Sequence, residues 1–172
     1  MNSPSVLNYF IGAGVLSFDA GRTGTFRDLG NAPSFRMKPT LTKVEHNSSR
    51  DGSRSVDRTL ITGQKIEVTI ELEEITPANL ALAFLGTTGA NSSGQTVIDI
   101  FTTSAITGAL KFVGSNNVGA RFEVLLNSVE FTPDAEFDWI SEEITSITLA
   151  GIATNVTGSF GTITEIATEA TA

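Results

Sequence analysis

The chain of 172 residues has no cysteine and only one histidine, one tryptophan and one tyrosine. The absence of cysteine excludes disulfides and thiolate metal sites. No apolar run approaches the ~18 residues that a membrane-spanning helix needs, and no basic-then-apolar signal pattern opens the chain. We therefore expect a protein without a membrane anchor that is made and folded in a cytoplasm.

Charged residues are also scarce, at 17% against roughly 25% in ordinary soluble domains, and their two signs are separated along the chain. Residues 1–65 carry nine Lys/Arg and five Asp/Glu, whereas residues 66–172 carry two Lys/Arg and 14 Asp/Glu. This division fits either a solvated surface or a basic surface of one copy that meets an acidic surface of the next. Without a dense basic run, sequence-reading recognition of nucleic acid is disfavoured.

Abundant Thr, Val, Ile and Phe, together with 16 glycines, indicate a β-rich fold with many turns. We expect one domain over 1–172, with an N-terminal arm at 1–7 and a frayed tail at 166–172. The predicted strands cover residues 8–19, 25–29, 34–45, 65–73, 96–102, 109–113, 119–131, 140–154 and 157–165. Residues 87–95 are predicted to form a loop.

The segment 65–73 has the clearest strand pattern. Its apolar positions alternate strictly with polar ones and are Ile66, Val68, Ile70 and Leu72. Such a period of two predicts one buried face and one wet face.

Two departures from regular strand patterns are also informative. Pro39 lacks a backbone N–H, which predicts an edge strand or a bulge at 34–45. The phase of the apolar residues shifts near Asn127 and Ser128, which predicts a β-bulge there.

Residues 77–85 are predicted to form one short helix. Thr76 suits the N-cap, Pro77 the first helical position and Gly86 the C′ position. The helix is apolar on nearly all sides, through Leu80, Leu82, Phe84 and Leu85. It must therefore be covered on more than one face. A sheet can cover one side, and a neighbouring subunit is the candidate for the other.

The polar segment 46–58 is too long for a tight hairpin and is expected to project from the body as a loop. The residues expected to engage a neighbour are His46, Asn47, Arg50, Asp51, Arg54, Asp57 and Arg58.

Candidate catalytic groups are few. His46 would need Asp51 or Asp57 as an orienting carboxylate, but a hydrogen bond at the base of the loop explains it better. Glu71, Glu73 and Glu74 suit the wet face of a strand.

Candidate metal and nucleotide motifs are incomplete as well. Asp134, Glu136 and Asp138 lack the EF-hand spacing. The glycines at 12–14 lack the third glycine of a dinucleotide fingerprint. The sequence therefore predicts a non-enzyme with no cofactor and no metal.

Several pieces together resemble the tail tube protein of tailed bacteriophages, most strongly over residues 8–86. These pieces are 9–19, Arg27-Asp28-Leu29-Gly30-Asn31-Ala32-Pro33, Val44-Glu45-His46-Asn47-Ser48-Ser49-Arg50-Asp51-Gly52, Asp57, Asn79-Leu80-Ala81 and Leu85-Gly86.

The resemblance implies a mainly β fold, a β-sandwich or partly closed barrel of two antiparallel sheets with one flanking helix. Six copies would form a ring, and stacked rings would form the tube that conducts double-stranded DNA without reading its sequence. The loop at 46–58 would reach adjacent subunits or rings. The helix residues Leu80, Leu82, Phe84 and Leu85 would lie at the subunit contact.

The resemblance also implies a location and partners. The protein would be made in the cytoplasm of a bacterial host and would end in the tail of the virion. Its partners would be copies of itself and other tail proteins, namely the tape measure, the tail terminator and the distal tail or baseplate.

The acidic excess suits a DNA channel, because a negative wall repels phosphates and lets DNA slide. The candidate carboxylates for the channel wall are Glu67, Glu71, Glu73, Glu123 and Glu130.

Two alternatives remain open from the sequence. One is the tube protein of a contractile system, such as a contractile phage tail, a pyocin or a type VI secretion system. The other is a stand-alone β-sandwich module that binds carbohydrate or decorates a capsid, which would expose aromatic side chains on one face.

Overall fold

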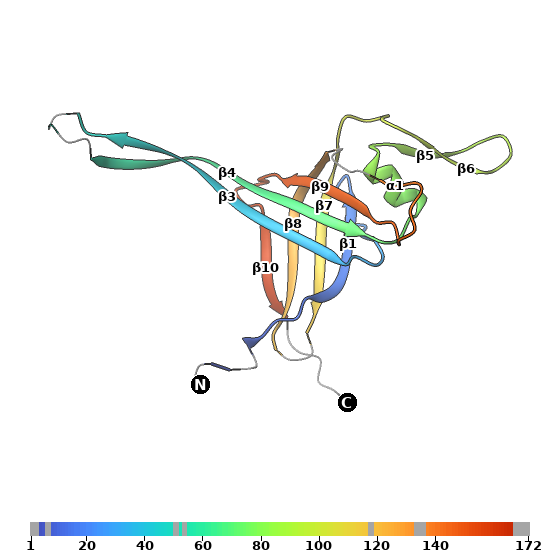
Figure 1. Ribbon diagram of the computed structural model, residues 1–172, viewed down its shortest axis with the longest axis horizontal. Coiled ribbons are helices and arrows are strands. Elements are labelled where there is room, and N and C mark those ends of the chain that lie inside the picture. Colours follow the sequence, from blue (N-terminus) through green and yellow to red (C-terminus); the bar gives the residue numbers. More distant parts are fainter. Residues whose placement is uncertain are drawn as a thin grey trace.

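The computed structural model describes residues 4–5, 8–49, 52, 55–116, 119–132 and 137–166 (Figure 1). It is mainly β, with two antiparallel sheets and one short helix. The elements are β1 (Ala13–Ala20), β2 (Arg27–Asp28), β3 (Ser34–Asn47), β4 (Val56–Leu72), α1 (Pro77–Ala83), β5 (Thr87–Ala90), β6 (Thr96–Asp99), β7 (Ile106–Ser115), β8 (Arg121–Thr132), β9 (Ile147–Ala153) and β10 (Gly161–Ile166).

The larger sheet has eight strands in the order β2-β1-β7-β8-β9-β4-β3, and β10 also pairs with β8. β8 changes partner along its length: residues 121–126 pair with β10, and residues 129–132 pair with β9. Within the described residues, the second sheet consists of β5 and β6. The predicted fold class is confirmed, although the described strands of the larger sheet do not close into a barrel.

The two layers of the core are the two halves of the larger sheet. Between Leu126 and Val129, β8 has one residue more than the facing stretch of β7, which is the bulge predicted at Asn127 and Ser128. Beyond this bulge the sheet folds over, so that Phe35 of β3 meets Phe112 of β7 at a ring-centroid distance of 5.6 Å. Aliphatic side chains of β4 and β9 thus pack against those of β1, β7 and β8.

β4 buries the face that the sequence predicted. Val68, Ile70 and Leu72 are fully buried and Ile66 is half-buried. β3 is an edge strand, which is how it accommodates Pro39 opposite Ile66.

The helix α1 begins as predicted and ends earlier. The N–H of Asn79 donates to Thr76 Oγ1 at 3.2 Å, and Pro77 occupies the first turn. Phe84 is the C-cap and Leu85, with φ of 46°, takes the left-handed C′ position that was predicted for Gly86. The N–H of Gly86 donates to the carbonyl of Ala81 at 2.8 Å, which completes a Schellman motif. Burial of Leu85 in the core holds this uncommon conformation.

The buried side chain of Asn79 joins α1 to the turn after β2. Its Nδ2 donates to the carbonyls of Leu29 and Glu74, both at 2.9 Å, and its Oδ1 accepts from Arg27 Nη1 at 2.8 Å. Gly30 has φ of 84° and lies so close to the Glu74 carboxylate that a Cβ would clash with it. Two pieces of the chain about 50 residues apart are therefore locked together by polar contacts.

A buried carboxylate holds the turn that follows β1. Asp19 accepts hydrogen bonds from the N–H and Oγ1 of Thr23, both at 2.9 Å, and from the N–H of Gly24 at 2.7 Å. Burial alone would raise the pKa of Asp19, but these bonds and one from Thr25 N–H outweigh it, so the pKa lies below its usual 3.8.

Several predicted boundaries are wrong, each for a local reason. Residues 46–47 and 56–58, predicted as loop, continue the β3–β4 ladder. Residues 140–146, predicted as strand, lie outside β9 and follow an aromatic cluster in which Phe137 and Trp139 pack on Phe84. Residues 87–90, predicted as loop, pair with β6 although they lack apolar alternation.

We expect Asn79→Ala to lower the free energy of unfolding by about 2–3 kcal/mol, because it leaves buried backbone carbonyls and Arg27 without a partner. Denaturant titration measures this, with the exposed Asn155→Ala as a matched control that shifts stability by less than about 0.5 kcal/mol. Equal effects of the two substitutions would contradict the role assigned to Asn79.

We expect Asp19→Asn to destabilise the protein at pH 7 and to matter less in acid. Because the folded pKa of Asp19 lies below the unfolded one, its charge stabilises the fold above the unfolded pKa, and this contribution fades as the pH falls through the folded value. Thermal denaturation at pH 7 and near pH 3 tests this, with Asp99→Asn as control. A Tm difference from wild type that is the same at both pH values would refute it.

Candidate assembly surfaces

β3 and β4 extend beyond the sheet as a two-stranded arm, formed by residues 41–47 and 56–64 (Figure 1). β9 pairs with β4 only from Ile66 onward, so among the described residues no third strand joins the arm. The exposed apolar side chains of the arm are Leu41, Val44, Val56, Leu60 and Ile61. An isolated two-stranded ribbon is only marginally stable in water. Exposed apolar side chains on such a ribbon are therefore suited to contact a partner.

The outer end of the arm carries a histidine–carboxylate pair. His46 Nδ1 lies 2.6 Å from Asp57 Oδ1, and both side chains are exposed. This pair ties the two strands together, as the sequence suggested for His46. His46, Asn47, Asp57 and Arg58 lie on the arm, whereas Arg50, Asp51 and Arg54 fall outside the described residues.

The larger sheet ends in strands with a free side. β3 pairs only with β4, and β10 pairs only with β8, within the part of the chain that the structure describes. β2 covers β1 only at Ser17 and Phe18. These edges present backbone N–H and C=O groups that can pair with another chain.

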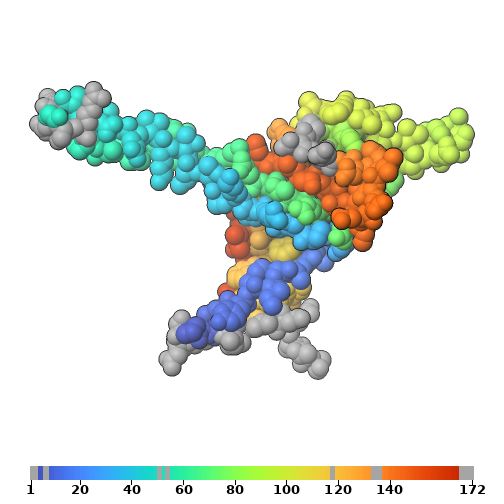
Figure 2. All heavy atoms as spheres, viewed as in Figure 1, coloured from blue at the N-terminus to red at the C-terminus, as the bar shows by residue number. Residues whose placement is uncertain are grey.

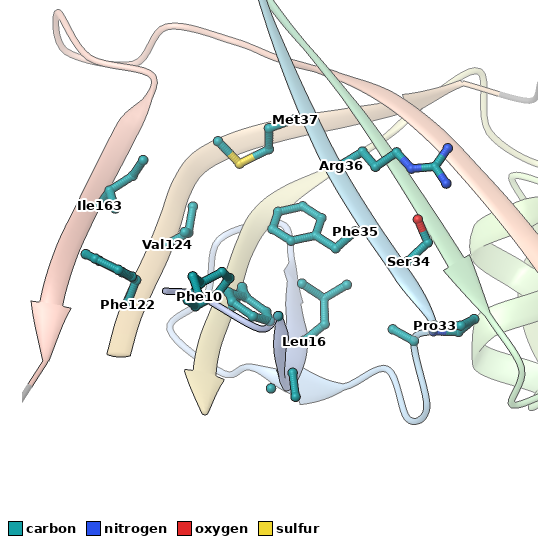
Figure 3. A pocket seen from close by; sticks show the side chains of 15 residues that line it. Phe10, Leu16, Pro33, Ser34, Phe35, Arg36, Met37, Phe122, Val124 and Ile163 are labelled. Atoms are coloured by element: carbon teal, nitrogen blue, oxygen red, sulfur yellow. The ribbon is translucent and has the colours of Figure 1, made fainter. Parts of the chain in front are cut away.

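An apolar groove of about 510 Å³ opens between the two layers (Figure 3). Phe35 and Met37 of β3 line one wall, and Phe122 and Val124 of β8 line the other with Ile163 of β10. Phe10 lies against Phe122, with the ring centroids 5.9 Å apart. The groove is the gap that remains because the sheet does not close.

The predicted contact helix is covered mainly by its own chain. Leu82 and Leu85 are buried in the core, and Leu80 and Phe84 are half-buried. The ring of Phe84 stacks on Trp139 at a centroid distance of 6.3 Å, and Trp139 also meets Phe137 edge-on at 4.6 Å. The outer layer at this helix is therefore Trp139 and its neighbours.

The surface around Trp139 was not predicted from the sequence. Trp139 is 70% exposed, Ile140 98% and Ile144 84%. We define the aromatic–acidic surface as these apolar residues with Phe84 and the adjacent acidic ones, namely Phe84, Phe137, Asp138, Trp139, Ile140, Glu142, Glu143 and Ile144. The sequence signal for this surface is the segment 137–144, in which acidic and large apolar residues occur together without strict alternation.

Four of the five candidate channel carboxylates lie on outward faces of the larger sheet, three on the layer that contains β4 and β9 and Glu123 on the other layer. Glu67 and Glu71 alternate with the buried residues of β4. Glu130 lies between the buried Val129 and Phe131, and Glu123 lies between two residues that line the groove. Glu67 and Glu130 are both paired with Ile152, so they fall on one row across three strands.

The remaining candidate, Glu73, follows β4 and accepts a hydrogen bond from Asn31 Nδ2. Glu67 is held by two lysines, since Lys65 Nζ lies 2.8 Å and Lys38 Nζ 3.5 Å from its carboxylate oxygens. The hydrogen bond from Lys65 and the attraction of both ammonium groups lower the pKa of Glu67. Among the described residues, no Lys or Arg forms an ion pair with Glu71, Glu123 or Glu130, so no neighbouring cation offsets their charge.

Reactive groups are not gathered anywhere in the described residues, where no cluster of three or more His, Asp or Glu side chains could hold a metal ion. Asp134 and Glu136 fall outside the described residues. No helix in the described part of the chain has the length and apolar character to cross a membrane.

Comparisons with known proteins identify a family. The sequence model of the family described as "Protein of unknown function UCP028589" matches residues 9–99, more than half of the chain. A search of the curated proteins found no match. Among solved structures, a chain of "Tail of empty GTA particle computed with helical refinement, C6 symmetry" is similar at 11% identity and a TM-score of 0.49, with 90% of this chain and 96% of that chain covered. The family match spans the arm and α1.

Proposed function

We propose that this chain, which belongs to the family described as "Protein of unknown function UCP028589", is a structural protein that assembles with copies of itself into a tail tube. Six copies form a ring, rings stack head to tail, and double-stranded DNA passes through the channel. The observation that carries this proposal is that the chain is incomplete as a monomer.

The accessible surface supports this incompleteness. It measures 11602 Å², whereas a compact monomer of 18.1 kDa would expose roughly 8,100 Å². The projecting arm and the open groove contribute to this excess.

The free strand edges support a ring. A sheet that ends in unpaired edges risks unspecific aggregation unless another chain covers them. In a closed ring every copy offers its edges to the next, so the sheets of all copies join into one barrel and no edge remains. This is the arrangement that the resemblance over residues 8–86 implies.

The charge of the outward sheet face supports a DNA channel. In the proposed ring the outward face of β4, β9 and the end of β8 lines the lumen, with Glu71 and Glu130 repeated in every copy. Carboxylates repel phosphates, so DNA meets no binding site along the wall. The tube belongs to the tail of a virion, and its ends contact other tail proteins.

The first test asks whether the arm drives assembly. Replacing residues 43–62 by Asn-Gly joins the paired residues Thr42 and Gly63 through a two-residue turn. We expect an unchanged Tm within a few degrees, because the arm adds no core, but no rings or tubes in negative-stain micrographs. Wild-type protein forms them as its concentration rises.

The matched control shortens the other projecting hairpin, by replacing residues 91–95 with Asn-Gly between the paired Ala90 and Thr96. It is expected to assemble like wild type. A wild-type protein that stays monomeric at high concentration would overturn the proposed function. Normal tubes from the variant without the arm would overturn only the role of the arm.

The second test reverses the charge of the channel wall. In tubes of Glu130→Lys every subunit adds a cation to the lumen, so we expect them to retain linear DNA at low salt and release it as salt rises. A filter-binding assay compares them with wild-type tubes and with Asp99→Lys, an exposed substitution on β6. Equal DNA retention by both lysine variants, or by neither, would contradict the lumen assignment.

A further inference from the structure

We infer that the aromatic–acidic surface of one copy is the docking site for the arm of a second copy. This inference rests on the proposed function and adds the specific contact. The structure carries it through shape, charge and position.

The aromatic–acidic surface is preorganised for an apolar partner. Trp139 is held between Phe84 and Phe137 by ring contacts at 6.3 and 4.6 Å. Two hydrogen bonds fix the backbone around it: Thr145 Oγ1 donates to the carbonyl of Asp138 at 3.2 Å, and the N–H of Glu143 donates to Ser141 Oγ at 3.0 Å. A rigid, exposed tryptophan flanked by aliphatic side chains is the usual composition of a binding hot spot.

The arm supplies a matching apolar surface. Val44 lies opposite Leu60, and Ile61 lies opposite Lys43 on the other face of the ribbon. Both faces therefore carry exposed aliphatic groups, 53% exposed at Val44 and 58% at Ile61. Contact with Trp139, Ile140 and Ile144 would remove apolar surface from water on both partners.

The charges of the two surfaces are complementary. Residues 41–64 contain four Lys/Arg and three Asp/Glu, a net charge of +1, whereas no Lys or Arg follows Arg121 in the chain. The aromatic–acidic surface carries Asp138, Glu142 and Glu143. Opposite potentials steer the arm to this surface and fix its orientation.

The positions of the two surfaces favour contact between copies. The arm and the segment 137–146 lie on opposite sides of the molecule (Figures 1 and 2). An arm therefore does not fold back on the aromatic–acidic surface of its own chain. Docking between two different surface patches is head-to-tail, and repeated head-to-tail contact yields closed rings or filaments.

Cross-linking between copies tests this directly, because the chain has no cysteine of its own and each introduced thiol is the only one. A size-tagged Val44→Cys variant is mixed with untagged Ile140→Cys, allowed to assemble and mildly oxidised. We expect a covalent heterodimer on non-reducing gels, since docking brings the two thiols within disulfide reach. Ile61→Cys replaces Val44→Cys in a parallel mixture, so that both faces of the arm are probed.

The matched control pairs the same arm variants with Ile163→Cys, which is 66% exposed and lines the groove. Assembly with cross-links to Ile140→Cys, and at least tenfold fewer to Ile163→Cys, supports the inference. Assembly with cross-links chiefly to Ile163→Cys, or to neither position, overturns this docking site while self-assembly stands. Absence of any assembly, checked by negative-stain microscopy of the same samples, contradicts the proposed function together with the inference.

A charge exchange provides a second readout. Glu142→Lys with Glu143→Lys should raise the protein concentration needed for assembly about tenfold or more, and Arg58→Glu on the arm should partly restore it. Trp139→Ala should weaken assembly at least as much with an unchanged Tm. Weak assembly from Trp139→Ala with binding of the wild-type protein to a carbohydrate array would indicate a glycan site instead, and would overturn the inference.

Discussion

The bulge in β8 is the constraint on which the rest of the structure depends. One extra residue between Leu126 and Val129 bends the larger sheet so that β8 pairs with β10 before the bend and with β9 after it. The sheet folds over itself and buries one core between its halves. Because the strands of the described residues stop short of a closed barrel, β3 and β10 keep a free edge there and the groove between them stays open. The bend thus produces both a stable core and the surfaces that we propose to be completed by other copies.

The polar contacts of Asn79 tie α1 to the folded sheet. By holding Arg27, the Leu29 carbonyl and the Glu74 carbonyl, its side chain fixes the turn before β3 and the start of α1 together. The end of α1 then presents Phe84 to Trp139. A buried polar group therefore positions an exposed aromatic surface, and the arm is positioned on the opposite side by the same sheet. Rigid placement of the two surfaces is what head-to-tail assembly requires.

Much of this fold could be predicted from local pattern. Strict alternation located the buried face of β4, Thr76 and Pro77 located the start of α1, and the phase shift at Asn127 located the bulge. The predicted end of α1 was wrong because Leu85 adopts a positive φ, which is unfavourable for a non-glycine residue. Its burial in the core stabilises this conformation. Residues 46–58 were predicted as a loop because their polar composition obscures the ladder that residues 46–47 and 56–58 continue.

The surfaces were harder to predict than the fold. The exposed apolar residues at 140–144 look like a strand in sequence, but they precede β9, and the adjacent Trp139 stacks on Phe84. The outward row of glutamates could be listed residue by residue, but their common face depends on the registers of β4, β8 and β9. Pairing between distant strands is set by the whole core, which no local window of sequence contains.

The central claim is that the edges, the arm and the aromatic–acidic surface are covered by other copies of the chain. Amide hydrogen exchange, compared between dilute protein and the assembled state, measures this most directly. The account predicts strong new protection in β10, at residues 41–47 and 56–64 of the arm and at residues 138–145, with little change in the β7 core. Exchange in these segments that is as fast in the assembled state as in the monomer would contradict it.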